Sequence, residues 1–216
     1  MHWYYKAIVA ASFQLILAST LSADSDISFS AFDPDKTSTC EAELRSRGAT
    51  FQVLKPIDGP GQCGSPRPLR LTKLQGGVAL PRDVTLRCEM ALALANWVSE
   101  VVIPSAKLHM KSEPAKLDIS TSYQCRHRNG EADAKMSEHA YANAVDLMGI
   151  SFKNGDTMKI QERINSAAAV RAFQAAVRGG ACAYFTTVIG PTTNKYHANH
   201  LHLDLAERRN GFRLCE

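Results

Sequence analysis

Six cysteines constrain the fold of this 216-residue chain more than any other feature of its sequence. No two of them form the CxxC pair that binds metal or carries out redox chemistry. An even number of well-separated cysteines predicts disulfides, which form in oxidising compartments. Six cysteines allow fifteen pairings, and the sequence does not choose among them. The pairing that we expect joins Cys40 to Cys63, Cys125 to Cys182, and Cys88 to Cys215.

The N-terminal segment has the three parts of a secretory signal peptide. Lys6 is its one charged side chain, residues 7–17 are apolar, and the small residue Ala23 precedes the acidic Asp24. The apolar part is shorter than the ~20 residues of a membrane span, and no later stretch approaches that length. We therefore expect a signal peptide over residues 1–23 and a periplasmic or secreted protein with no stable membrane span after its removal.

The composition predicts a single globular protein and excludes several classes. Hydrophobic residues make up 45% and charged residues 21% of the chain, values unlike those of disordered or collagen-like chains. The net charge is +4, but the basic residues form no runs, so we expect no nucleic-acid partner. After the signal peptide we expect an N-terminal arm with a short helix over residues 24–62, and the main domain over residues 63–216.

Apolar residues at three- and four-residue spacing predict the helices. The longest such pattern follows Pro81 and runs from Leu86 to Val101, and Pro104 is expected to end or kink that helix. A second helix is expected over residues 162–178, closed by the glycine pair that follows it. A short helix is expected over residues 39–47, after a polar linker that reads as loose chain.

Alternating and β-branched segments predict the strands, over residues 50–54, 117–122, 144–152, 157–160, 185–189 and 201–206. The Asn154-Gly155 pair between the third and fourth of these segments is a strong hairpin signal. The order of the elements predicts an α+β fold, in which helices flank a small, mostly antiparallel sheet and disulfides staple the structure.

Histidines concentrate in two short segments, and the second is the more informative. It reads His197-Ala-Asn-His200-Leu-His202-Leu-Asp204-Leu. Because side chains alternate along a strand, His200, His202 and Asp204 share one face while the leucines share the other. The leucines therefore face a core, and the histidines face a site.

The first histidine segment places His139 seven residues before Asp146, which lies at the start of an apolar strand. If this strand neighbours the His202 strand, Asp146 can meet His202 while the preceding loop brings His139 to the same place. Two imidazoles and one carboxylate are a suitable ligand set for Zn²⁺, and three protein ligands leave the fourth position open, as in catalytic sites. We therefore expect the sheet to carry a zinc site.

The same segments carry a family resemblance. SEHAYANAVDL resembles the SxHxxGxAxD motif of the zinc D-Ala-D-Ala metallopeptidases, and HANHLHLD resembles the HxxHxH end of the penicillin-insensitive murein endopeptidases. Blocks from CGSPRPLRL through SYQCRHRNG and RGGACAYFTTVIGP to HANHLHLDLAERRNGFRLC resemble the bacterial extensin-like C-terminal domain family over about residues 63–215. One departure is Ala142, which stands where the peptidase motif has glycine, and a positive φ there would strain the ligand loop.

The resemblance implies roles for individual residues. His139, Asp146 and His202 would be the zinc ligands, His200 the general base or transition-state stabiliser, and His197 a further site histidine. The block around Cys125 resembles the arginine-bearing block of these peptidases. It implies that Arg126, or else Arg128, holds a substrate carboxylate or stabilises an oxyanion, unless both are solvated surface charges.

Two further acidic residues have open roles. Glu138 either orients His139 or is exposed, and Asp204 either sets a histidine tautomer or pairs with Arg208. A serine hydrolase is disfavoured because the chain has no GxSxG motif, and a nucleophilic cysteine would leave an odd thiol.

The resemblance implies an exported zinc peptidase that cuts peptidoglycan peptides at a D-Ala-type bond, as a carboxypeptidase or an endopeptidase, with zinc-bound water as nucleophile. The first alternative is a cell-wall-binding module that keeps the fold without catalysis. The second is a periplasmic zinc-binding or chaperoning protein.

Overall fold

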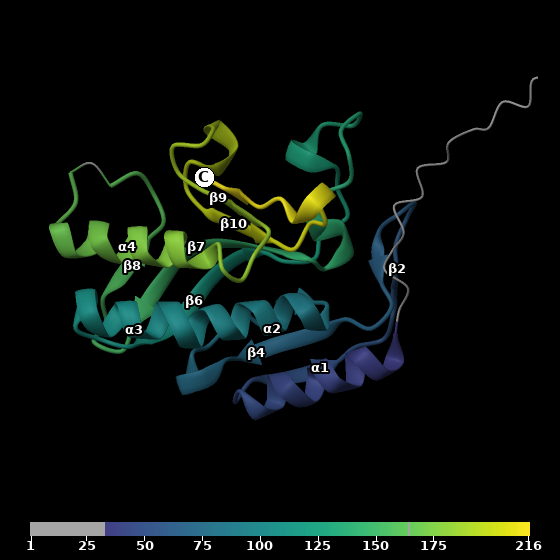
Figure 1. Ribbon diagram of the computed structural model, residues 1–216, viewed down its shortest axis with the longest axis horizontal. Helices are drawn as coiled ribbons and strands as arrows, with labels where there is room; N and C mark the ends of the chain where they lie inside the picture. Colours follow the sequence, from purple (N-terminus) through teal and green to yellow (C-terminus); the bar gives the residue numbers. More distant parts are fainter. Residues whose placement is uncertain (1–32, 164) are drawn as a thin grey trace, which may run out of the picture. The chain divides into compact units, whose positions relative to one another are not determined.

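The computed structural model describes residues 33–163 and 165–216, so the predicted signal peptide lies outside the described residues. Within that part the fold is α+β, and the sheets are mostly antiparallel, as predicted. Figure 1 shows α1 (Pro34–Ser46), α2 (Cys88–Trp97) and α4 (Ala168–Ala181) flanking the strands. None of the helices in the described ranges is long and apolar enough to cross a membrane.

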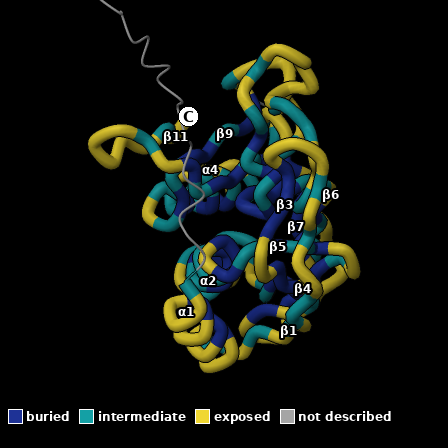
Figure 2. The backbone as a smooth tube through the Cα atoms, turned by 90° about the vertical axis from the view of Figure 1, so that its right-hand side faces the viewer, coloured by how far each residue is buried: buried dark blue, intermediate teal, exposed yellow. Residues whose placement is uncertain are grey.

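The main sheet has the strand order β11-β9-β10-β7-β6, with β8 also paired to β7. Its long strand β7 is buried along nearly its whole length, as Figure 2 shows in dark blue, and it occupies the predicted residues 144–152. The neighbours are antiparallel except that β11 runs parallel to β9. The bounds are β6 (Pro114–Thr121), β7 (Ala144–Phe152), β8 (Thr157–Lys159), β9 (Thr187–Ile189), β10 (Leu201–Asp204) and β11 (Leu214–Cys215).

The N-terminal region joins the same hydrophobic core as the main sheet. Strand β1 (Thr50–Val53) pairs with β4 (Leu69–Lys73), which pairs with β5 (Thr85–Leu86). A separate two-stranded sheet joins β2 (Ile57–Asp58) to β3 (Gly64–Ser65). Leu44 of α1 is fully buried in the core cluster that also contains Leu147 and Phe185. The described part of the predicted arm is therefore built into the domain.

Helix α1 begins five residues before the predicted start, so the reading of residues up to 38 as loose chain is wrong for its last part. The Asp33 side chain accepts hydrogen bonds from the backbone N–H groups of Asp35 and Lys36, and Pro34 occupies the first helical turn. This combination is a strong N-terminal cap, because proline has no N–H that would need a partner there. The helix ends near the predicted glycine, Gly48.

Pro104 does not end the long helix. After α2 the helical path continues through the π-helical turn η2 (Val98–Val102), the short α3 (Ile103–Ser105) and a second π-helical turn, η3 (Ala106–Met110). Wider turns on both sides accommodate a residue that lacks the N–H of the regular ladder. The path ends only at Lys111, which adopts the left-handed conformation with φ 53°.

Helix α4 begins later than predicted and runs through the two glycines expected to close it. A Cβ placed on Gly180 would lie 2.5 Å from Cγ1 of Val101 in η2. The glycine therefore permits close packing of α4 against the long helix. The neighbouring strand β9 is shorter than the predicted segment 185–189.

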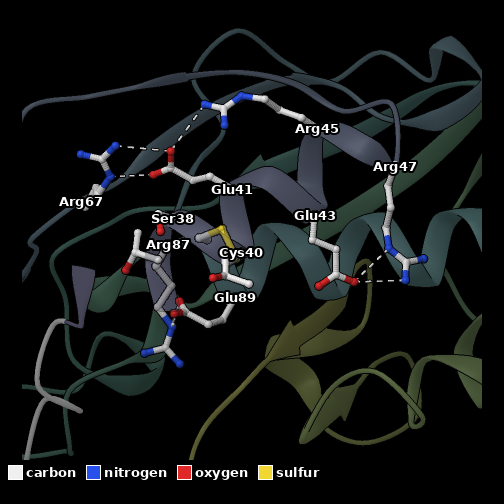
Figure 3. The surroundings of a disulfide bond; sticks show 12 residues. Ser38, Cys40, Glu41, Glu43, Arg45, Arg47, Arg67, Arg87 and Glu89 are labelled. Atoms are coloured by element: carbon white, nitrogen blue, oxygen red, sulfur yellow. Dashed lines mark hydrogen bonds and ion pairs between the residues drawn. A yellow bond between two sulfur atoms is a disulfide. The ribbon is translucent and has the colours of Figure 1, made fainter. Parts of the chain in front are cut away.

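Three disulfides form, as predicted, but the predicted pairing is wrong. The bonds are Cys40–Cys88, Cys63–Cys125 and Cys182–Cys215. The first joins α1 to α2, which pack side by side (Figure 3), and the third ties β11 to the end of α4. The correct partners depend on how the helices pack, which spacing along the chain does not reveal. Disulfides are typical of proteins in oxidising compartments.

Candidate metal centre

Three side chains from separate elements bring one ligand atom each to a common point. Asp146 in β7 and His202 in β10 are directly opposite in the antiparallel register, and His139 lies in the 3₁₀ turn η5 (Glu138–Tyr141) just before β7. Asp146 Oδ1 lies 3.2 Å from His139 Nε2 and 2.9 Å from His202 Nδ1, and the two nitrogens are 3.3 Å apart. Ligand atoms around a tetrahedral Zn²⁺ are separated by about 3.3 Å, so this triad fits the ion.

The turn that carries His139 is held at both ends. The Ser137 hydroxyl accepts a hydrogen bond from the His139 N–H, and Ala142 ends the turn in the left-handed conformation with φ 53°. Ala142 is also fully buried, and its carbonyl accepts a hydrogen bond from the Arg87 N–H. The position where the peptidase motif has glycine therefore does require a positive φ, and this chain adopts it with alanine.

Hydrogen bonds to the outer nitrogens set the tautomers of both histidines. His139 Nδ1–H donates to the backbone carbonyl of Ser122 at 2.7 Å, because a carbonyl can only accept. His202 Nε2–H donates to Asp204 Oδ2 at 2.9 Å. The nitrogens that face Asp146 are thereby left as acceptors in the neutral rings, which is the form that binds a metal.

The electrostatics of the cluster reflect two buried carboxylates around one imidazole. Burial opposes ionisation of Asp146, but its hydrogen bonds to His139 and His202 outweigh burial and lower its pKa. Burial also disfavours a charged His202, yet hydrogen bonds to Asp146 and Asp204 raise its pKa to about 9. The pKa of Asp204 is lowered, against burial, by its bond to His202. Without a metal, a proton on His202 thus compensates the carboxylates at neutral pH.

Asp146 and His202 of the triad line a cavity of about 360 Å³ that His197 and His200 also line. His200 Nε2 lies 3.6 Å from Asp146 Oδ1, and its Nδ1–H donates to Asn199. His197 Nδ1–H donates to Asn194. Burial is the main cause that lowers the pKa of both rings, to about 4 for His197. Both rings are therefore neutral at pH 7 and can accept a proton through Nε2.

The predicted arginines also line this cavity. Arg126 Nη2 lies 3.8 Å from Asp146 Oδ2, and its Nε donates to Gln124. Arg128 Nη2 lies 4.0 Å from Glu138 Oε1. Arg126 is thus beside the triad, whereas Arg128 is farther out and half exposed.

The predicted acidic residues take different partners. Glu138 accepts a hydrogen bond from Asn143 at 2.6 Å, and burial is the main cause that raises its pKa. The group that orients His139 is the Ser122 carbonyl instead. Of the two partners considered for Asp204, the structure shows His202. Arg208 instead donates to the Thr186 carbonyl and the Thr187 hydroxyl.

Sequence reasoning did not assign several groups that the structure places in the site. The Ser122 carbonyl is a backbone group, so no residue type announces its role. Asn194 and Asn199 lie close to the histidines in sequence, and polar neighbours within three residues of a site histidine are a usable signal. Arg208 and Thr187 also line the cavity, and only the strand order brings them there.

A comparison with known protein families gives a match that covers the residues of this site. The family model for the extensin-like protein C-terminus matches residues 38–216, which include most of α1 and every residue of the site described above. The chain belongs to this family. The match begins well before residue 63, in agreement with an N-terminal region that shares the core. A search of curated proteins finds no match for this extensin-like chain, and a search of solved structures finds none either.

Proposed function

We propose that this extensin-like protein is an exported, zinc-dependent peptidase that acts on peptidoglycan peptides. The observation that carries the proposal is the convergence of His139, Asp146 and His202 on one point at the edge of a cavity. Among the described residues, no fourth His, Cys, Asp or Glu joins this group, so the side toward the cavity stays open. Open sites of this kind are catalytic rather than structural.

The ion, held by these three ligands, would supply Lewis acidity and an activated water. His200 is placed to take a proton, because its ring is neutral and its free Nε2 faces Asp146 across 3.6 Å. Arg126 presents its guanidinium beside the triad, where it can bind a carboxylate or stabilise an oxyanion. The hydrogen bond from Arg126 Nε to Gln124 holds the arginine side chain in place.

The substrate class rests on the resemblance of SEHAYANAVDL and HANHLHLD to zinc D-Ala-D-Ala peptidases and murein endopeptidases. It implies cleavage at a D-Ala-type bond. A periplasmic or secreted location agrees with the three disulfides, which need an oxidising compartment.

The test compares product release from purified muropeptides by the wild type, His202→Ala and His109→Ala. His109 lies in η3, away from the cavity, and provides a matched loss of one histidine. We expect zinc near one ion per chain and product release from the wild type and His109→Ala only. Equal profiles from wild type and His202→Ala would refute the proposal. Metal binding and sacculus binding without any release would favour the non-catalytic cell-wall module.

A further inference from the structure

We propose that Arg208 forms a second anion-binding position in the metal-site cavity, so that the ligand carries a side-chain carboxylate. This inference rests on the proposed function and specifies its substrate class. Arg208 bonds to Thr187 of β9 and to Thr186 just before it, whereas Arg126 follows β6. In the sheet, β10 and β7 with the triad lie between β9 and β6. The two arginines therefore line the same cavity from opposite sides of the two strands that carry Asp146 and His202.

A comparison of the charges lining the cavity singles out Arg208. Asp146 and Asp204 are hydrogen-bonded to histidines, and Glu138 is bound to Asn143 with Arg128 nearby. By contrast, both hydrogen bonds of Arg208 go to neutral oxygens, and no carboxylate among the described residues lies within 4.0 Å of it. A guanidinium has five N–H donors, so most of this fork remains available to an anion.

The surroundings of Arg208 define the shape of the group that it binds. Ile189 and Leu214 line the cavity with it, and both are half-buried. Thr187 lines the same part, and its hydroxyl accepts from Nη2 of Arg208. Two aliphatic side chains beside a guanidinium that is held by hydrogen bonds suit an aliphatic stem that ends in a carboxylate. The inferred ligand is thus a peptide with an acidic side chain close to the peptide bond that is to be cleaved.

The bonds of Arg208 also make this position rigid. Nη1 donates to the Thr186 carbonyl at 3.1 Å and Nη2 to the Thr187 hydroxyl at 2.7 Å. A guanidinium held in this way loses little conformational entropy when it binds a carboxylate. Arg209, its neighbour in sequence, is exposed and does not line the cavity. It is therefore a matched control.

The experiment measures binding, with turnover suppressed by His200→Ala in every protein. The probes are two diaminopimelate-containing stem peptides that differ only in the side-chain carboxylate, which is free in one and amidated in the other. The parent protein carries His200→Ala alone. We expect it to bind the free acid at least about tenfold more tightly than the amide, measured by calorimetry. Arg208→Gln should reduce this ratio to within about twofold, and Arg209→Gln should leave it unchanged.

Equal binding of the two peptides by the parent overturns the inference, and so does a tenfold ratio that survives Arg208→Gln. If Arg208→Gln lowers the melting temperature, Arg208→Lys is measured in its place. Lysine keeps the positive charge but lacks the forked donor geometry of a guanidinium. The ratio for Arg208→Lys should fall below that of the parent, and a parent-like ratio counts against the inference. Failure of the proposed peptidase appears differently, as no product release by wild type while the preference between the peptides remains.

Discussion

The molecule buries carboxylates in two regions and compensates them differently. Glu41 of α1 is 4% exposed, and it receives a bidentate contact from Arg67 at 2.6 and 3.3 Å, with Arg45 at 3.5 Å. This group lies beside the Cys40–Cys88 bond, as Figure 3 shows. In the metal-site cavity, Asp146 and Asp204 are each 5% exposed, and their main partners are imidazoles.

The two regions differ in whether the positively charged partner of the carboxylate can lose its proton. An arginine keeps its charge at every accessible pH, so Glu41 has a permanent counter-ion and its region is purely structural. A histidine can release its proton, so the imidazoles around Asp146 can exchange that proton for a metal ion. The cavity beside Asp146 would give such an ion access to the triad. A buried carboxylate is thus informative about function chiefly through the type of its partner.

The largest expected effect is the loss of a ligand. We expect His202→Ala to lower zinc affinity by more than about a hundredfold, since even changes one shell farther out cost about 10–100-fold. Competition with a chromophoric chelator measures the affinity. His109→Ala should bind zinc like the wild type. An unchanged affinity in His202→Ala would show that the triad is not the metal site.

A smaller loss of affinity is expected for Asp204→Asn. The amide oxygen can still accept from His202 Nε2, but the negative charge that supports this ring is lost. Zinc affinity should fall by about 10–100-fold while the stoichiometry stays at one. Asp118→Asn, a change at a half-buried aspartate of β6 that does not line the cavity, serves as the control. Affinities that match in the two variants would remove Asp204 from the site.

The structural region should respond in stability instead. Arg67→Ala leaves Glu41 buried with only the more distant Arg45, and we expect it to cost about 2 kcal/mol of unfolding free energy. Arg45→Ala, at the longer and more exposed contact, should cost less than about 0.5 kcal/mol. Denaturant titration measures both. Zinc affinity should be unchanged in either variant, and a change would break the division between the two regions.

Metal binding should depend on pH because of His202. The pKa of about 9 in the metal-free protein means that zinc must displace a proton at neutral pH. Apparent zinc affinity should therefore rise by up to about tenfold per pH unit and level off above pH 9. Calorimetry in buffers of different ionisation enthalpy should detect the released proton. An affinity that is flat from pH 6.5 to 8.5 would contradict this assignment of the proton.

The smallest effect concerns the strained turn. Ala142→Gly removes the cost of a positive φ but also removes a buried methyl group, so the unfolding free energy should change by less than about 1 kcal/mol. Ala140→Gly, equally buried but without a positive φ, is the control and should be more destabilising by about 1 kcal/mol. Equal losses in the two variants would mean that Ala142 is not strained.

Local patterns in the sequence predicted the strands that build the site. The alternation from His200 to Asp204 gave the face of β10, and the apolar run after Asp146 gave β7 to the residue. One error occurred at the start of α1, where Asp33 and Pro34 cap a helix that begins in a polar segment. Of the two outcomes expected at Pro104, an end of the helix is wrong, because π-helical turns on both sides continue the helical path.

The sequence by itself determined which residues have side chains able to ligate a metal and which of them share a strand face, because residue type and a period of two are local properties. Only the tertiary structure decided that Asp146 pairs with His202, that the Ser122 carbonyl holds His139, and which cysteines join. It also brought Arg208 into the same cavity. These contacts join residues that are distant in the chain, and they depend on the order of strands and the packing of helices, which no local spacing encodes.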